Sequence, residues 1–255
     1  MIEEKKEAFG RLLTIMDELR EQCPWDRKQT MESLATLTVE ETYELIDEIE
    51  KGELTGIKEE IGDIMLHMVF YAKIGDEKGA FNIADSLNSV CDKLIRRHPH
   101  IYGDVNVEDD EEVKKNWERI KMSEKGKKSV FQGVPNALPA VIKAQRMQEK
   151  AAQVGFEWEQ PEDVWAKVEE EIGELKEAIA TTEIDKKTDE FGDVMFSLIN
   201  FARFIGVDAN RALDLTNRKF KARVEYIEQN SKKSLPDMTL EEMDILWERA
   251  KIEKV

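Results

Sequence analysis

The sequence EETYE at residues 40–44, followed by EIGD at residues 60–63, is the part of the chain that decides the fold. A second pair of motifs, EEIGE at 170–174 and EFGD at 190–193, follows the first at a constant offset of 130 residues. Each motif carries acidic residues three positions apart, a spacing that puts both side chains on one face of an α-helix. The pattern therefore predicts acidic helices, and its recurrence predicts that one helical unit is present twice.

The duplication extends beyond the acidic motifs. Residues 247–251 (WERAK) repeat residues 117–121 (WERIK) at the same offset of 130, and the basic residues within 92–97 are matched by those within 218–223. No segment shows the alternating apolar pattern that is typical of β-strands. The sequence thus predicts an all-α fold made of tandem, duplicated helical bundles.

Glycine and proline place the boundaries of the two predicted domains. We expect an N-terminal domain at residues 1–122 and a C-terminal domain at 140–255. The linker between them, residues 123–139, contains two glycines and two prolines, which are typical of a connecting segment.

Helix ends are predicted from capping residues. Apolar spacing predicts helices at 34–51 and 57–74, each ended by the glycine that follows it, Gly52 or Gly75. The residues expected to begin later helices as N-caps are Asn82, Asp109, Asp208 and Thr239. Gly62 and Gly192 fall within predicted helices, where glycine is unfavourable, and therefore indicate the close approach of a neighbouring helix or a ligand.

Composition and charge exclude several classes of protein. The net charge of −17 disfavours nucleic acid as a partner, because a duplex-binding surface needs clustered Lys and Arg. Only Cys23 and Cys91 occur, without a CxxC motif, which argues against a disulfide framework or a zinc site. No apolar run approaches the ~20 residues of a membrane span, and the acidic N-terminus lacks the pattern of a signal peptide. We therefore expect a cytoplasmic protein without a membrane partner.

The acidic motifs predict two carboxylate clusters, because antiparallel packing of the motif helices brings four carboxylates together in each half. The expected clusters are Glu41, Glu44, Glu60 and Asp63 in the first half, and Glu171, Glu174, Glu190 and Asp193 in the second. Crowded, partly buried carboxylates need a counter-ion. An all-oxygen ligand set favours Mg²⁺, or Mn²⁺ in its place, over zinc or copper.

Two other interpretations compete with a magnesium site. Glu-rich helix faces are commonly solvated surface, but the apolar residues around each ExxD motif and the repetition of the whole set argue against that. A di-iron carboxylate bundle expects Glu-x-x-His pairs. His67 follows Asp63 by four positions, but Ser197 occupies the equivalent position of the second half, so redox iron is disfavoured.

Basic and aromatic residues offer contacts for a phosphate and a base. The pairs Lys93/Arg97 and Lys219/Arg223 are each four positions apart, so each pair could clamp phosphate oxygens from one helix face. The same spacing is equally typical of solvated surface charges. Trp117 and Trp247 are either stacking platforms for a base or, more commonly for tryptophan at helical spacing, core residues.

Together these motifs resemble the MazG family of nucleoside triphosphate pyrophosphohydrolases in its two-domain form. The resemblance rests on residues 170–174, 190–193 and 217–223 and on Trp247, and it covers nearly the whole chain, including Pro24-Trp25-Asp26. It implies Mg²⁺-dependent hydrolysis of NTPs and dNTPs, ATP among them, to the monophosphate and pyrophosphate by a metal-activated water. It also implies a homodimer whose bundles are intertwined or packed together, and a house-cleaning role in the nucleotide pool.

The resemblance assigns roles to individual residues. Glu171, Glu174, Glu190 and Asp193 would hold the metal, Lys219 and Arg223 would contact the triphosphate, and Trp247 would lie by the nucleoside. Lys167, and Lys186 in the loop before ExxD, match family positions near the nucleotide. Glu170 is expected to orient the ligands or accept a proton, which makes Glu170, Glu171 and Glu174 the expected catalytic set.

The second half is the expected main active site. Positions 167, 186 and 187 are lysines, whereas the positions 130 residues earlier are Leu37, Gly56 and Ile57. The first half keeps its carboxylates together with Lys93, Arg97 and Trp117, so we expect it to bind metal. Two rival functions remain open: a narrower pyrophosphohydrolase for dUTP, phosphoribosyl-ATP or an oxidised nucleotide, and a non-enzymatic helical regulator that binds nucleotide or a protein partner.

Overall fold

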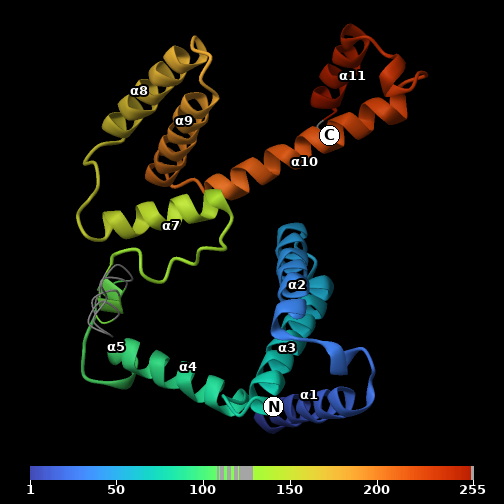
Figure 1. Cartoon of the computed structure of the whole chain (residues 1–255), viewed down its shortest axis with the longest axis vertical. Coiled ribbons are helices and arrows are strands. Elements are labelled where there is room, and N and C mark those ends of the chain that lie inside the picture. The colour runs from blue at the N-terminus through green and yellow to red at the C-terminus, as the bar shows by residue number, and fades with distance from the viewer. Residues whose placement is uncertain (108, 110–111, 114–115, 118–119, 121–128, 254–255) are drawn as a thin grey trace. The chain divides into compact units, whose positions relative to one another are not determined.

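The structure, a computed structural model, describes residues 1–107, 109, 112–113, 116–117, 120 and 129–253 (Figure 1). These residues form helices, turns and connecting segments and include no strand, which confirms the predicted all-α class. The chain divides into two compact units, Met1–Glu124 and Lys125–Val255, and each is described by itself below. No helix among the described residues is long and apolar enough to cross a lipid bilayer.

The first unit is built around an antiparallel helical hairpin. Its elements are α1 (Ile2–Gln22), η1 (Asp26–Lys28), α2 (Met31–Lys51), α3 (Leu54–Glu77), α4 (Ile83–Arg97) and the short α5 (Pro99–Tyr102). The hairpin consists of α2 and α3, and it reverses at Gly52, whose φ of 73° is a left-handed conformation that glycine adopts without strain. Because the reversal is tight, the acidic faces of α2 and α3 lie next to each other.

The core of the first unit joins α1 to this hairpin. Met16 of α1, Leu34 of α2 and Phe70 of α3 are almost completely buried in one apolar cluster. Arg20 closes the end of the cluster, where it donates to the Glu77 carboxylate at 2.9 Å and to the backbone oxygen of Gln29 at 3.1 Å. The apolar side of α3 is therefore packed in the core, and its acidic side is available to form a carboxylate cluster.

The second unit repeats the hairpin. Its elements are α7 (Ala140–Ala152), α8 (Pro161–Ile179), α9 (Ile184–Phe204), α10 (Ala209–Asn230), η2 (Leu235–Asp237) and α11 (Leu240–Ile252). Helices α8 and α9 form the hairpin, with Val164, Val168 and Ala178 of α8 fully buried. Helix α10 packs on α7, α9 and α11 and runs away from the α8–α9 hairpin (Figure 1).

Most of the predicted helix caps are confirmed. Asn82 and Thr239 form capping boxes, Asp208 accepts from the backbone N–H of Arg211, and Asp109 accepts from that of Glu112. Two residues of the predicted box at 109–112, and residues 123–128 of the predicted linker, lie outside the described residues.

The glycine predictions were partly wrong. Helix α3 does not end at Gly75 but continues to Glu77. A Cβ on Gly75 would lie 2.8 Å from the backbone oxygen of Phe81, so this glycine is needed for the close approach of the returning chain. A Cβ on Gly62 or Gly192 would meet no described atom within 4 Å. No neighbouring helix of the described residues therefore explains these two glycines, and of the two predicted neighbours only a ligand stays a prediction.

Candidate active site

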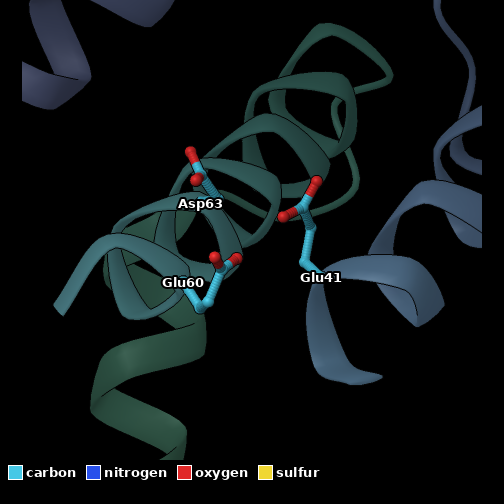
Figure 2. Close-up of side chains that lie close together, drawn as sticks. All are labelled: Glu41, Glu60 and Asp63. Carbon is cyan, nitrogen blue, oxygen red and sulfur yellow. The ribbon is translucent and has the colours of Figure 1, made fainter. Parts of the chain in front are cut away.

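The first carboxylate cluster lies between α2 and α3. Figure 2 shows Glu41 of α2 facing Glu60 and Asp63 of α3. One carboxylate oxygen of each residue lies within 4.8 Å of the other two, which is close enough for all three to bind one cation. The i,i+3 spacing on α3 and the tight reversal at Gly52 together produce this arrangement.

The second cluster is formed by the equivalent helices α8 and α9. Here Glu171, Glu174 and Glu190 each offer an oxygen within 4.8 Å of the other two. The predicted fourth members, Glu44 in the first half and Asp193 in the second, lie outside these groups of three. The two halves therefore share the positions of Glu41/Glu171 and Glu60/Glu190 but differ in the third carboxylate.

The clusters show the electrostatic strain of crowded acids. Desolvation raises the pKa of Glu41 and of Glu60, and the negative charges of nearby carboxylates raise both further, although a hydrogen bond with Glu60 lowers the pKa of Glu41 in part. For Glu60 the neighbours include Glu44, so this residue acts on the first cluster through its charge although it lies outside the group of three. Desolvation, followed by the charges of Glu171 and Glu190, likewise raises the pKa of Glu174.

Lys167 partly neutralises the second cluster. Its Nζ lies 2.8 Å from Glu170 Oε1 and 2.7 Å from Glu171 Oε1. Hydrogen bonds to Glu170 and then to Glu171 raise the pKa of Lys167 well above its usual range, so it is a cation at neutral pH. The equivalent position of the first half is Leu37, so this position supplies no cation to the first cluster.

The donor set of the second cluster fits a hard divalent cation. Glu171 is only 6% exposed, and its second oxygen, Oε2, is buried without a hydrogen-bond partner among the described residues. A buried carboxylate oxygen of this kind is costly unless a cation or a donor reaches it. Three carboxylates with one unsatisfied oxygen form an all-oxygen site of the type that Mg²⁺ or Mn²⁺ prefers.

The helices that carry the predicted phosphate-binding residues lead away from the carboxylates of the same chain. Lys219 is ten residues past the beginning of α10, and Glu190 is fourteen residues before the end of α9. At 1.5 Å per residue, they lie about 15 and about 21 Å from the corner where the two helices meet. Helix α10 diverges from α9 beyond that corner (Figure 1), and α4, which carries Lys93, diverges from α3 in the same way.

Each of the two late tryptophans lies beside an arginine of its own half. The guanidinium of Arg223 stands 5.3 Å from the ring centroid of Trp247, and that of Arg97 stands 5.0 Å from the ring of Trp117. Phe220 contacts the Trp247 ring as well, at 5.6 Å between centroids. Both tryptophans are half-buried, so cation–π contact holds each arginine in place. A position of Trp247 by the nucleoside stays a prediction.

The structure corrects one predicted position. Lys186 is part of the first turn of α9 and not of the preceding loop. It therefore lies four positions before Glu190 on the same helix face, at the edge of the second cluster.

Sequence reasoning missed a group of buried polar residues near the second cluster. Gln148 of α7 and Asn200 of α9 are 7% and 5% exposed, and Arg203 donates to the Asn200 side chain. A signal was present, because the residue 130 positions before Asn200 is Phe70. A change from an apolar to a polar residue at a buried position of a repeat indicates that the two copies differ in what they contact.

Both halves of the chain match one known protein family. Residues 29–102 and 159–228 match the family described as the MazG nucleotide pyrophosphohydrolase domain, and the two segments include both carboxylate clusters. The chain belongs to this family. The family is present twice, as the duplication predicts, and its membership places the chain among the nucleotide pyrophosphohydrolases.

Similar proteins extend over nearly the whole chain. A nucleoside triphosphate pyrophosphohydrolase/pyrophosphatase MazG of Thermotoga maritima is 46% identical over 95% of this chain and 95% of its own length. A nucleoside triphosphate pyrophosphohydrolase of Escherichia coli K12 is 38% identical over 97% of this chain and 98% of its own. An uncharacterized Bacillus subtilis protein, YabN, is 42% identical over 95% of this chain but only 51% of its own length.

Proposed function

We propose that this protein hydrolyses nucleoside and deoxynucleoside triphosphates to the monophosphate and pyrophosphate in the presence of Mg²⁺. The observation that carries the proposal is the cluster of Glu171, Glu174 and Glu190, in which one buried Glu171 oxygen has no hydrogen-bond partner in the described part of the chain. Family membership and the names of the two full-length relatives point to the same reaction class. The two free cysteines, Cys23 and Cys91, agree with a reducing cytoplasm.

The residues of the second cluster have distinct tasks in this proposal. Glu171, Glu174 and Glu190 would hold Mg²⁺, with Asp193 one turn further along α9 as a fourth donor. Bound there, the ion supplies Lewis acidity toward a phosphoryl oxygen and lowers the pKa of a nearby water. Lys167 holds Glu171 in place through its 2.7 Å contact, and Glu170, on the other side of Lys167, is the solvent-accessible carboxylate that can accept a proton.

The pyrophosphate leaves as a highly charged group and needs cations of the protein. Lys219 and Arg223 provide them in this proposal, because Arg223 is held against Trp247 and presents a planar guanidinium to phosphate oxygens. Lys186, one turn before Glu190, adds a positive charge at the other end of the cluster. These residues stabilise the charge that develops on the leaving group.

A homodimer would bring these cations to the carboxylates. Within one chain α10 carries Lys219 and Arg223 away from the α8–α9 hairpin, so a second copy is the natural source of the missing contacts. The outer faces of α3 and α9 support such an assembly. Ile61, Met65 and Met68 form an exposed apolar stripe at helical spacing, and the equivalent residues Phe191, Met195 and Leu198 form another. Gly62 and Gly192 lie beside these stripes, and no described atom lies within 4 Å of where their Cβ would be.

The second half is the proposed working site. It has Lys167 beside the cluster and Lys186 at its edge, where the first half has Leu37 and Gly56. The first half keeps its three carboxylates and the Arg97–Trp117 contact, which suit the binding of a cation and a phosphate.

A pyrophosphate-release assay tests the proposal. The full-length protein is assayed with the common NTPs and dNTPs, dUTP, phosphoribosyl-ATP and an oxidised nucleotide, each with Mg²⁺ and with EDTA. We expect Mg²⁺-dependent release of pyrophosphate from several NTPs, and none in EDTA. Turnover of a single special substrate would narrow the function to that substrate, and no turnover of any of them would refute the proposed activity.

A further inference from the structure

His67 is a buried histidine that the proposed reaction does not involve. It lies on α3 and is 8% exposed, and its ring nitrogen Nδ1 is buried without a hydrogen-bond partner among the described residues. A polar nitrogen buried in this way is costly unless a hydrogen-bonding group or a cation reaches it. The isolated nitrogen therefore indicates a missing ligand, and its position on α3 indicates which kind.

His67 shares a helix face with two carboxylates of the first cluster. It follows Glu60 by seven positions and Asp63 by four, so all three side chains project from one side of α3. Side chains of an α-helix lean toward its N-terminus, which directs the ring of His67 over the turn that carries Asp63. His67 is thus the next potential ligand along this face, on the buried side of the three oxygens that lie within 4.8 Å of one another.

The polar groups on the other side of His67 have partners of their own. The next residue along the face is Tyr71, whose hydroxyl is hydrogen-bonded to that of Thr38 at 2.8 Å. The Thr38 hydroxyl donates in turn to the backbone oxygen of Leu34 at 2.9 Å. Tyr71 and Leu37 pack against the apolar core. The carboxylates are therefore the side from which a cation can approach His67 Nδ1.

The first cluster is accessible to an incoming ion. Asp63 is exposed, Glu41 and Glu60 are half-buried and His67 is buried, so the four donors extend from the solvent toward the interior. The three carboxylates face one another (Figure 2) and repel one another without a cation, so an ion between them would draw the side chains together. A neutral imidazole can bind that ion through Nδ1 while Nε2 carries the proton.

An imidazole nitrogen changes the metal that such a cluster prefers. Mg²⁺ is a hard cation that takes oxygen ligands, whereas imidazole suits Fe²⁺, Ni²⁺ and Zn²⁺. For divalent ions of the first transition series, the affinity of a nitrogen-containing site rises from Mn²⁺ through Co²⁺ toward Cu²⁺. Three carboxylates with one histidine therefore favour a transition-metal ion, while carboxylates alone favour Mg²⁺.

The second half does not repeat the nitrogen donor. The residue equivalent to His67 is Ser197, which is also 8% exposed. Its hydroxyl donates to the backbone oxygen of Val194 at 3.0 Å, so this position has a hydrogen-bond partner within its own helix. The second cluster instead has the cation of Lys167 beside Glu171. A mixed nitrogen and oxygen donor set is therefore a property of the first half.

We propose that His67 completes a metal site with Glu41, Glu60 and Asp63, and that this site selects a divalent transition-metal ion over Mg²⁺. The second half, with carboxylates alone, keeps its preference for Mg²⁺. The inference goes beyond the proposed reaction, because it concerns the half to which that reaction is not assigned. The two halves thus differ in the metal that they bind.

The ion Co²⁺ reports directly whether an imidazole binds it. The full-length protein with Glu174→Gln, which weakens the second cluster, is stripped of metal and loaded with one equivalent of Co²⁺. The ring N–H of a histidine bound to Co²⁺ gives a strongly shifted proton resonance, which disappears in D₂O. We expect one such resonance, lost in His67→Gln and retained when the other two histidines, His98 and His100, are changed to Gln. A spectrum without this resonance overturns the proposal, and so does a resonance that His67→Gln leaves unchanged.

Calorimetric titration with Co²⁺ and with Mg²⁺ measures the selectivity of the same protein. His67→Ser introduces the residue of the second half. We expect it to lower the ratio of Co²⁺ affinity to Mg²⁺ affinity by about tenfold or more, since even the loss of a residue that only supports a metal ligand costs that much. An unchanged ratio, or an equal loss for both ions, contradicts the proposal. If circular dichroism shows that His67→Ser does not fold, His67→Gln, which is closer in volume to histidine, decides.

Both measurements are independent of the proposed reaction, because neither contains a nucleotide. A protein that shows the histidine resonance but releases no pyrophosphate keeps the mixed metal site and loses the proposed reaction. Release of pyrophosphate by a protein without the resonance does the reverse.

Discussion

Glu174 and Glu44 occupy equivalent positions of the two halves, but only Glu174 lies within the group of three oxygens that can share a cation. We predict that Glu174→Gln lowers kcat/KM for ATP by about 100-fold, or ~2.7 kcal/mol of transition-state stabilisation. Glu44→Gln should leave most of the activity, because the working site is in the other half. Pyrophosphate release measures both, with Glu177→Gln, on an exposed position one turn further along α8, as the control. Equal losses from the two cluster variants would contradict the assignment of the site.

The crowding of carboxylates makes a prediction about the metal-free protein. The pKa of Glu60 is raised by desolvation and by Glu44, Glu41 and Asp63. Between pH 4.5 and that raised pKa, the folded state binds more protons than the unfolded state, so the free energy of unfolding falls as the pH rises. Glu60→Gln should therefore raise the melting temperature in EDTA at pH 7 and weaken its decline between pH 4.5 and 7. Glu59→Gln, on the neighbouring exposed position, should do neither. A lower melting temperature for Glu60→Gln would show that the negative charge of Glu60 is already compensated by a positive group in the metal-free protein.

For single residues, the sequence predicted which residue types form the site but not the conformations of their side chains. The i,i+3 spacing identified every carboxylate that the structure brings together, because helix geometry fixes which residues share a face. Spacing does not fix rotamers, which is why it could not show that Glu44 and Asp193 lie outside the groups of three. Gln148 was missed because it lies on α7, a helix with no acidic motif, and its isolation from donors depends on the packing of α9.

Among the elements, α1 is attached to α3 by two ion pairs, Asp17 with Lys73 and Arg20 with Glu77. Arg20 forms a bidentate contact with Glu77, and hydrogen bonding to Arg20 lowers the pKa of Glu77. Because the pKa of Glu77 is lower in the folded state than in the unfolded state, its ionisation stabilises the folded state at pH values above the unfolded pKa of 4.5. This stabilisation is lost as the pH falls through the folded-state pKa. Glu77→Gln should therefore cost up to about 1 kcal/mol at pH 7, since solvent screens part of the pair.

Chemical denaturation at pH 7 and at pH 3 measures this contribution. The difference between wild type and Glu77→Gln should be present at pH 7 and shrink at pH 3. Glu3→Gln removes an exposed pair with Lys6 within α1 and should have little effect at either pH. An equal cost of Glu77→Gln at both pH values would show that packing, and not charge, holds α1 at this point.

The existence of the helices was predictable, but not all of their ends. Capping residues identified the beginnings of α4, α10 and α11, because an N-cap is a local interaction between neighbouring residues. Gly75 was interpreted as a helix end because glycine commonly follows one, yet it serves the approach of Phe81 from the next segment. That reason is a tertiary contact, which no local pattern contains. The direction in which α10 leaves the hairpin is likewise set by its packing on α7 and α9.

At the scale of the whole molecule, the proposed homodimer predicts complementation between two defective chains. Glu174→Gln removes a carboxylate and Arg223→Ala removes a cation on the diverging α10. If the partner's α10 completes each site, a mixed dimer contains one site with both residues intact. We expect unfolding and refolding of an equimolar mixture to restore about a quarter of the wild-type activity, because half of the dimers are mixed and each has one intact site.

The measurement is pyrophosphate release before and after the two variants are refolded together. Each variant refolded alone is the control and should stay nearly inactive. Activity no higher than that of the separate variants, in a protein shown to be dimeric by light scattering, would mean that each site is completed by its own chain.

Lys167 has a consequence for the order in which the two halves take up metal. An ion that enters the second cluster must compete with the Lys167 ammonium group, which is already paired with Glu171. The first cluster has Leu37 at the equivalent position, so an ion meets no such competitor from that position. The first half should therefore fill at lower Mg²⁺ concentration and act as a permanently loaded, structural ion site. The second half, with a cation of its own, can release and rebind its ion during each turnover. Calorimetric titration of the metal-free protein should show two successive steps, and Lys167→Leu should merge them into one.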